Sequence, residues 1–222
     1  MSGARDSEIY FTNEQWKQLR SDERLIGIAT LARATNALAM AYPLLMIPVR
    51  YQSPRARRDR MSAFLYAAAV LFEGLQVSRS LAKHFRDLPQ FQTGFGLIHS
   101  DKKVQKLEGQ FLKKLRDKAA FHFDRDVLAK GLKELDFQEA RFASGRGWRT
   151  GSTYFDIVDD AVLVFLTGAA SDAEHLELLD KYMTSTAELA NRFLSASHRL
   201  IPQVLRMLGG QMRMIRPKRG AA

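Results

Sequence analysis

The apolar residues between positions 101 and 122 recur with the period of an α-helix. Val104, Leu107, Phe111, Leu115 and His122 fall on one face of a helix when successive residues are rotated by about 100°. Such an apolar stripe is stable in water only when it packs against another apolar surface. This segment therefore predicts an assembly of several helices.

Helical patterns account for most of the remaining chain. Thr12 and Gln15 have the spacing of a capping box before a short first helix, and Ser171 and Glu174 repeat that spacing before the last one. The longer segments expected to be helical are 22–42, 60–87, 101–121, 124–135, 159–168 and 171–208. We expect an all-α, up-and-down helical bundle, and the β-compatible runs within 139–157 leave room for one small β-hairpin.

Prolines and glycines mark the expected breaks between helices. Pro43, Pro48 and Pro54 predict a loop over 43–60. Residues 88–100 contain one proline and two glycines and predict a connection, and Pro202 predicts a kink or an early end in the last helix. The expected organisation is an N-terminal segment (1–20), a helical bundle domain (21–208) and a basic, disordered tail (209–222).

The composition excludes several classes of chemistry. With 222 residues, 46% of them hydrophobic, the chain can form one domain with a sizeable core. It has no cysteine, which excludes disulfides, thiolate metal sites and a cysteine nucleophile. Its five histidines are scattered without helical i, i+4 pairs, so no metal or other cofactor is expected. The start of the chain lacks a signal-peptide pattern and polar residues interrupt the apolar stretches, so we expect a cytoplasmic protein without a membrane partner.

The net charge of +10 favours an anionic partner such as nucleic acid, and a solvated basic surface accounts for it equally well. The cations gather in the predicted loop, along the 101–121 helix and at the end of the chain. They are Arg50, Arg55, Arg57, Arg58 and Arg60; Lys102, Lys103, Lys106, Lys113, Lys114 and Lys118; and Arg213, Arg216, Lys218 and Arg219.

The end of the 101–121 helix carries three side chains that could cleave RNA without a metal. Arg116 can hold a phosphate, Asp117 can orient a neighbour, and His122 can move a proton near neutral pH. The spacing of Arg116 and His122 is weak evidence by itself, because Arg79 with His84 and Arg192 with His198 have a similar spacing. Of these three arginines, only Arg116 is directly followed by a carboxylate. In an unbroken helix Arg116 and His122 would lie about 120° apart, so they converge only if the helix ends near 121 or a second subunit contributes.

The segment from Arg116 to His122 resembles the signature of the HEPN superfamily. This signature consists of an arginine, a polar residue and then a histidine after four to six positions. The resemblance implies a small helical bundle. Many HEPN domains act as metal-independent ribonucleases in toxin or antiphage systems. It implies that Arg116, Asp117 and His122 form a site at a homodimer interface and yield 2′,3′-cyclic phosphate ends. A neutralising or nucleotidyltransferase-like partner protein is also consistent with it.

The surroundings of this motif suggest further site residues. Glu73 is a candidate supporting acid, with a solvated helix carboxylate as the alternative. The candidate RNA-binding residues are Arg55, Arg57, Arg58, Arg60, Lys113, Lys114 and Lys118.

A purely structural interpretation of the motif remains open. Arg116 could complement the helix dipole, Asp117 could pair with Lys113 or Lys114, and His122 could pack at the helix end. Many HEPN domains keep the fold without activity. The alternative function is therefore a non-catalytic RNA- or protein-binding module.

Overall fold

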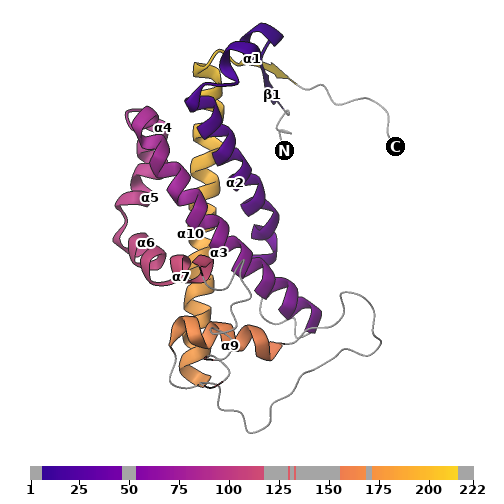
Figure 1. The fold of residues 1–222 in the computed structure, drawn as a ribbon, viewed down its shortest axis with the longest axis vertical. Helices are drawn as coiled ribbons and strands as arrows, with labels where there is room; N and C mark the ends of the chain where they lie inside the picture. Colours follow the sequence, from indigo (N-terminus) through magenta and orange to yellow (C-terminus); the bar gives the residue numbers. More distant parts are fainter. Residues whose placement is uncertain are drawn as a thin grey trace, which may run out of the picture.

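The structure of the protein, a computed structural model, describes residues 7–46, 54–117, 130, 133, 156–168 and 172–214. Within these residues the chain is predominantly helical, with one small antiparallel sheet, so the predicted all-α class is confirmed (Figure 1). Residues 139–155 of the predicted hairpin lie outside the described residues. Its last two residues begin helix α9 (Asp156–Thr167), so no strand ends there.

Three long helices form the frame of the molecule: α2 (Glu23–Leu45), α3 (Pro54–Phe85) and α10 (Asp172–Met207). They lie side by side and pack pairwise (Figure 1). One hydrophobic core fills the space between them, because each helix directs an apolar stripe inward. Its largest fully buried side chains include Ile28, Leu31, Leu38, Phe64, Leu71, Leu75 and Phe193.

A series of short helices, which we call the helical arm, packs against this frame. It comprises α4 (Pro89–Phe91), the π-helical turn η1 (Gln92–Gly96), α5 (Leu97–Ser100), α6 (Lys102–Leu107), a second π-helical turn η2 (Glu108–Leu112) and α7 (Lys113–Leu115). Its first half contacts α10, and η2 and α7 contact α3. The predicted stripe is confirmed as far as it is described, since Val104, Leu107, Phe111 and Leu115 are buried.

The prediction of a connection over 88–100 is wrong, because the arm is helical there. Gly94 is buried, and a Cβ at this position would lie 3.0 Å from the Cβ of Ala196 on α10. The glycine therefore allows two helices to approach closely, whereas sequence reasoning took it as a turn residue.

The predicted loop over 43–60 is also wrong at both ends. Helix α2 continues through Pro43 to Leu45, and the carbonyl that loses its donor belongs to the exposed residue Ala39, where water can replace it. Pro54 begins α3, a position where proline is favoured because its missing N–H would have no helical partner. Arg55, Arg57 and Arg58 consequently lie on the helical backbone of α3 instead of a loop.

The two ends of the described chain pair with each other. Strand β1 (Ser7–Tyr10) runs antiparallel to β2 (Gln211–Met214), with Ser7 opposite Met214. Helix α10 is not ended by Pro202, and Gly209 adopts a φ of +94° that turns the chain towards β2. Residues 211–214 are therefore a strand, not the beginning of a disordered tail.

One of the two predicted capping boxes can be compared with the structure. Helix α1 (Asn13–Leu19) has the expected capping box, in which the Gln15 amide donates to Thr12 Oγ1 at 3.2 Å and the Thr12 amide donates to Gln15 Oε1 at 2.8 Å. The box at Ser171 lies outside the described residues, as does the predicted helix at 124–135 apart from the helical residues Lys130 and Lys133.

Two described segments are long and apolar enough to cross a membrane by length and composition: Glu23–Leu45 and Asp59–Phe85. The polar residues Arg33, Asn36 and Glu73, on which the expectation of no membrane span rests, lie within them. Both helices contribute to the hydrophobic core, and core helices of soluble proteins pass the same test.

Candidate functional site

The structure brings together three of the residues predicted to form a site. Arg116 follows α7 at the end of the arm, and its Nε donates to Glu73 Oε1 on α3 at 2.6 Å. Its Nη1 donates to Asp117 Oδ1 at 2.9 Å. The Arg116 and Glu73 side chains are about half exposed, at 42% and 48%. His122 lies outside the described residues.

These contacts hold the guanidinium in one orientation at the surface. The hydrogen bonds from Arg116 to Asp117 and Glu73 raise the pKa of its guanidinium above the ordinary value, so Arg116 is always charged. A guanidinium has five N–H donors, so donors remain for a phosphate oxygen after both carboxylates are engaged. Exposed ion pairs of this kind contribute little to stability.

The other predicted RNA-binding residues differ in their accessibility. Lys113 and Lys114 are exposed on α7, next to Arg116. Arg60 on α3 is partly buried, its Nε has no hydrogen-bond partner, and burial lowers the pKa of its guanidinium. Arg60 is thus poorly placed to contact a long nucleic acid. Lys118 and the side chains of Arg55, Arg57 and Arg58 lie outside the described residues.

A polar cluster that sequence reasoning missed joins the arm to α3. The guanidinium of Arg79 binds both carboxylate oxygens of Glu108, and Gln76 Nε2 donates to Glu108 Oε1 at 2.9 Å. Glu108 lies in the π-helical turn η2 and is only 8% exposed. The wider turn buries it together with its neighbour Leu107. No local pattern signals this pair, because its members are 29 residues apart.

The same cluster contains a serine and a histidine in contact. Ser78 Oγ lies 2.8 Å from His99 Nε2, and the Ser78 hydroxyl donates to the Leu75 carbonyl at 2.9 Å. A hydroxyl has one proton, so His99 Nε2–H is the donor to Ser78 Oγ. Ser78 is fully buried. The pair therefore holds α5 against α3 and is not an activated nucleophile, which would need the opposite proton arrangement and an accessible Oγ.

The partly buried position of His99 makes the stability of the protein depend on pH. Burial, followed by the charge of Arg79, lowers the pKa of His99 from 6.5 to about 4. The unfolded chain binds a proton at this histidine near pH 6.5, and the folded protein does so only near pH 4. Stability is therefore lost as the pH falls through this window.

We expect the free energy of unfolding to decrease by about 2 kcal/mol between pH 7.5 and pH 4.5 through this group, after allowance for partial solvent screening. Urea unfolding of the wild type and of His99→Gln at both pH values gives the change in the free energy of unfolding with pH for each protein. The difference between the two changes is the contribution of His99. His198→Gln, a change at an exposed histidine of α10, serves as the control. An equal pH dependence in wild type and His99→Gln would contradict the prediction.

The other two arginines with a histidine at similar spacing form inter-element ion pairs. Arg79 binds the buried Glu108, and Arg192 Nη1 on α10 donates to Asp101 Oδ2 at 2.7 Å. Asp101 also caps α6 through the amide of Lys103. Both pairs fasten the arm to the long helices. Arg116 does the same through Glu73 of α3, but its ion pairs are more exposed than the Arg79–Glu108 pair.

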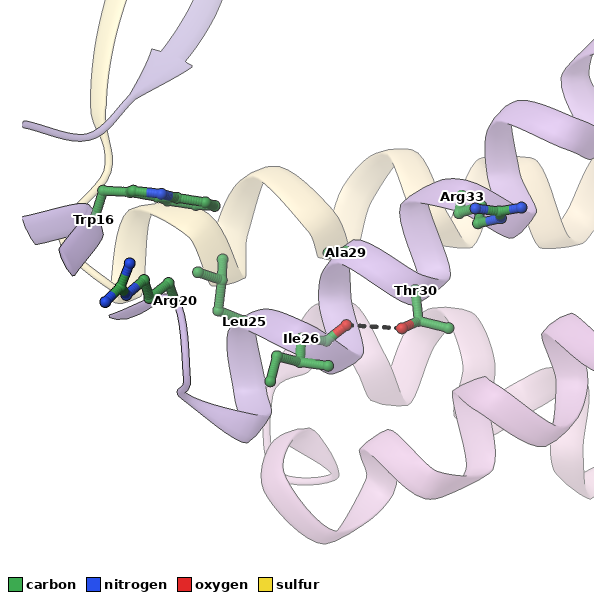
Figure 2. A pocket seen from close by; sticks show the side chains of 7 residues that line it. All are labelled: Trp16, Arg20, Leu25, Ile26, Ala29, Thr30 and Arg33. Atoms are coloured by element: carbon green, nitrogen blue, oxygen red, sulfur yellow. Dashed lines mark hydrogen bonds between the residues drawn. The ribbon is translucent and has the colours of Figure 1, made fainter. Parts of the chain in front are cut away.

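A shallow hollow of about 350 Å³ lies between α1 and α2 (Figure 2). Trp16 and Arg20 stand at one end and Arg33 at the other, over an apolar floor. The Thr30 hydroxyl in its wall donates to the Ile26 carbonyl at 2.8 Å. The hollow lies near the N-terminal end of the bundle, away from Arg116. Among the described residues, no group of histidines and carboxylates could hold a metal ion.

Comparison with known proteins adds no relative to these observations: no family model, no curated protein and no solved structure matches the chain.

Proposed function

We propose that this protein is a HEPN-like, metal-independent endoribonuclease that cleaves single-stranded RNA to 2′,3′-cyclic phosphate ends. The observation that carries the proposal is the placement of Arg116. Glu73 and Asp117 hold its guanidinium at the surface, next to exposed lysines. A fixed, always charged fork suits a phosphate whose oxygens gain charge during cleavage.

The proposed mechanism assigns one task to each side chain. Arg116 binds the scissile phosphate and stabilises its developing negative charge, and Asp117 orients Arg116. His122 removes the proton of the ribose 2′-hydroxyl or protonates the leaving 5′-oxygen, for which the ordinary histidine pKa of about 6.5 is suitable. In a homodimer, two copies of these residues would face one cleft. Such an enzyme fits a toxin or antiphage system in the cytoplasm with a neutralising partner.

Incubation of purified protein with end-labelled single-stranded RNA in EDTA tests this proposal. We expect cyclic-phosphate ends from the wild type and none from His122→Ala. His198→Ala, which changes an exposed histidine outside the motif, should cleave like the wild type. A folded wild-type protein that leaves varied RNAs intact would contradict the proposal.

The second candidate function is a non-catalytic RNA- or protein-binding module. It is favoured by one feature of the same site: two carboxylates outweigh the single charge of Arg116, which weakens the binding of a scissile phosphate there and leaves RNA binding to the exposed lysines nearby. This module would bind RNA in a salt-dependent manner, and binding would survive His122→Ala.

A further inference from the structure

The exposed face of the arm between residues 102 and 114 is entirely neutral or cationic. Its exposed residues are five lysines, two glutamines and one glycine. We call the five the lysine track; its members are Lys102, Lys103, Lys106, Lys113 and Lys114. The apolar residues of the segment all face the core.

The acidic residues of this part of the chain do not neutralise the track. Asp101 binds Arg192 of α10, Glu108 is buried against Arg79, and Asp117 binds Arg116. Each carboxylate of the arm is thus held by an arginine. Glu73 of α3 also binds Arg116 and leaves one net negative charge at that end, against the five positive charges of the track. A net positive field therefore remains available to an external anion.

The track has the length and direction expected of a binding surface for a strand of RNA. The twelve-residue separation of Lys102 and Lys114 corresponds to at most about 18 Å, the length of an α-helix at about 1.5 Å per residue, because the wider π-helical turn η2 lies within it. At about 3.4 Å per phosphate along one stacked strand, this length spans about five phosphates. Arg116 lies three residues after Lys113, which is about one helical turn, so the end of the track neighbours the proposed catalytic site.

We propose that the lysine track binds the sugar–phosphate backbone of single-stranded RNA and guides it to Arg116; the second part rests on the proposed ribonuclease function. Lysine contacts to phosphates carry little sequence information, so this binding is tolerant of base sequence. An anionic membrane is a poorer fit, because an interfacial helix needs apolar side chains on its outward face, and this face of the arm has none between 102 and 114.

Binding of a 2′-O-methyl oligonucleotide, whose blocked 2′-oxygen prevents cleavage, tests the track separately from catalysis. Fluorescence anisotropy over a range of salt concentrations gives the slope of log binding constant against log salt concentration. This slope should be smaller by about 1.4 in Lys106→Gln/Lys113→Gln, since each lost phosphate contact on a single strand changes it by about 0.7. Lys17→Gln/Arg206→Gln removes the same charge from exposed sites on α1 and α10. This control should keep the wild-type slope.

The outcomes separate the track from the nuclease. A reduced slope confined to the track variant, in a protein that cleaves no RNA, supports the track and contradicts the nuclease. A wild type that cleaves RNA, with an unchanged KM in the track variant, supports the nuclease and overturns the track. An equal loss of slope in the control variant also overturns the track. So does a result in which these lysines are needed for binding to anionic vesicles but not for binding to RNA.

Discussion

Replacing Glu108 by alanine is expected to lower the free energy of unfolding by about 3 kcal/mol. Glu108 is the buried carboxylate through which η2 is fastened to α3, and it accepts hydrogen bonds from Arg79 and Gln76. Its removal leaves the partly buried guanidinium of Arg79 without a counter-charge. That unpaired charge, more than the lost attraction, causes the destabilisation.

Urea unfolding at neutral pH measures this effect. Glu188→Ala, at an exposed position of α10, should change stability by less than about 0.5 kcal/mol. The double variant Arg79→Met/Glu108→Leu should recover most of the loss, because an apolar pair leaves no buried charge. If Glu108→Ala were as stable as Glu188→Ala, the ion pair would not be what holds the arm to α3.

Arg116→Lys is expected to reduce the rate of RNA cleavage by about 100-fold, a loss typical of one electrostatic contact to the transition state. Lysine keeps the positive charge but lacks the planar fork that binds Glu73 and Asp117 and that, in the proposed mechanism, also binds the phosphate. Stability should change by less than about 1 kcal/mol, because the ion pairs are exposed. Single-turnover cleavage of a labelled RNA, with urea unfolding of the same preparation, measures both quantities.

Two further variants define the role of this site. Arg24→Lys makes the same change at an arginine paired with Asp22 at the start of α2, and it should leave cleavage unchanged. Glu73→Gln removes one carboxylate from Arg116, so RNA binding should stay the same or tighten while the cleavage rate falls. Unaltered cleavage in Arg116→Lys would show that this arginine does not act on the phosphate.

Local patterns in the sequence were sufficient for most of the long helices and for one contact of the candidate site. The stripe from Val104 to Leu115 is buried as predicted, since a period of about 3.6 residues places its members on one face whatever that face contacts. The Thr12 capping box is present because its bonds join residues three positions apart. Arg116 and Asp117, which the sequence predicted as site residues, are in contact.

The tertiary structure decided what these local patterns could not. Pro54 begins a helix and Gly94 lies within one, because the effect of a proline or glycine depends on the backbone partners and neighbouring helices it meets. The pairing of β1 with β2 joins residues about 200 positions apart, and Arg116 reaches Glu73 only because α7 packs on α3.

The Arg79–Glu108 ion pair and the Ser78–His99 contact show the same limit most clearly. In the sequence each of these residues is an ordinary polar position, three of them on predicted helices and His99 in the predicted connection. Their energetic importance arises from burial and from partners 21 to 29 residues away. Helix periodicity specifies which face of each helix is apolar, but the identity of the facing helix, and therefore of the buried polar partners, is set only when the helices pack together.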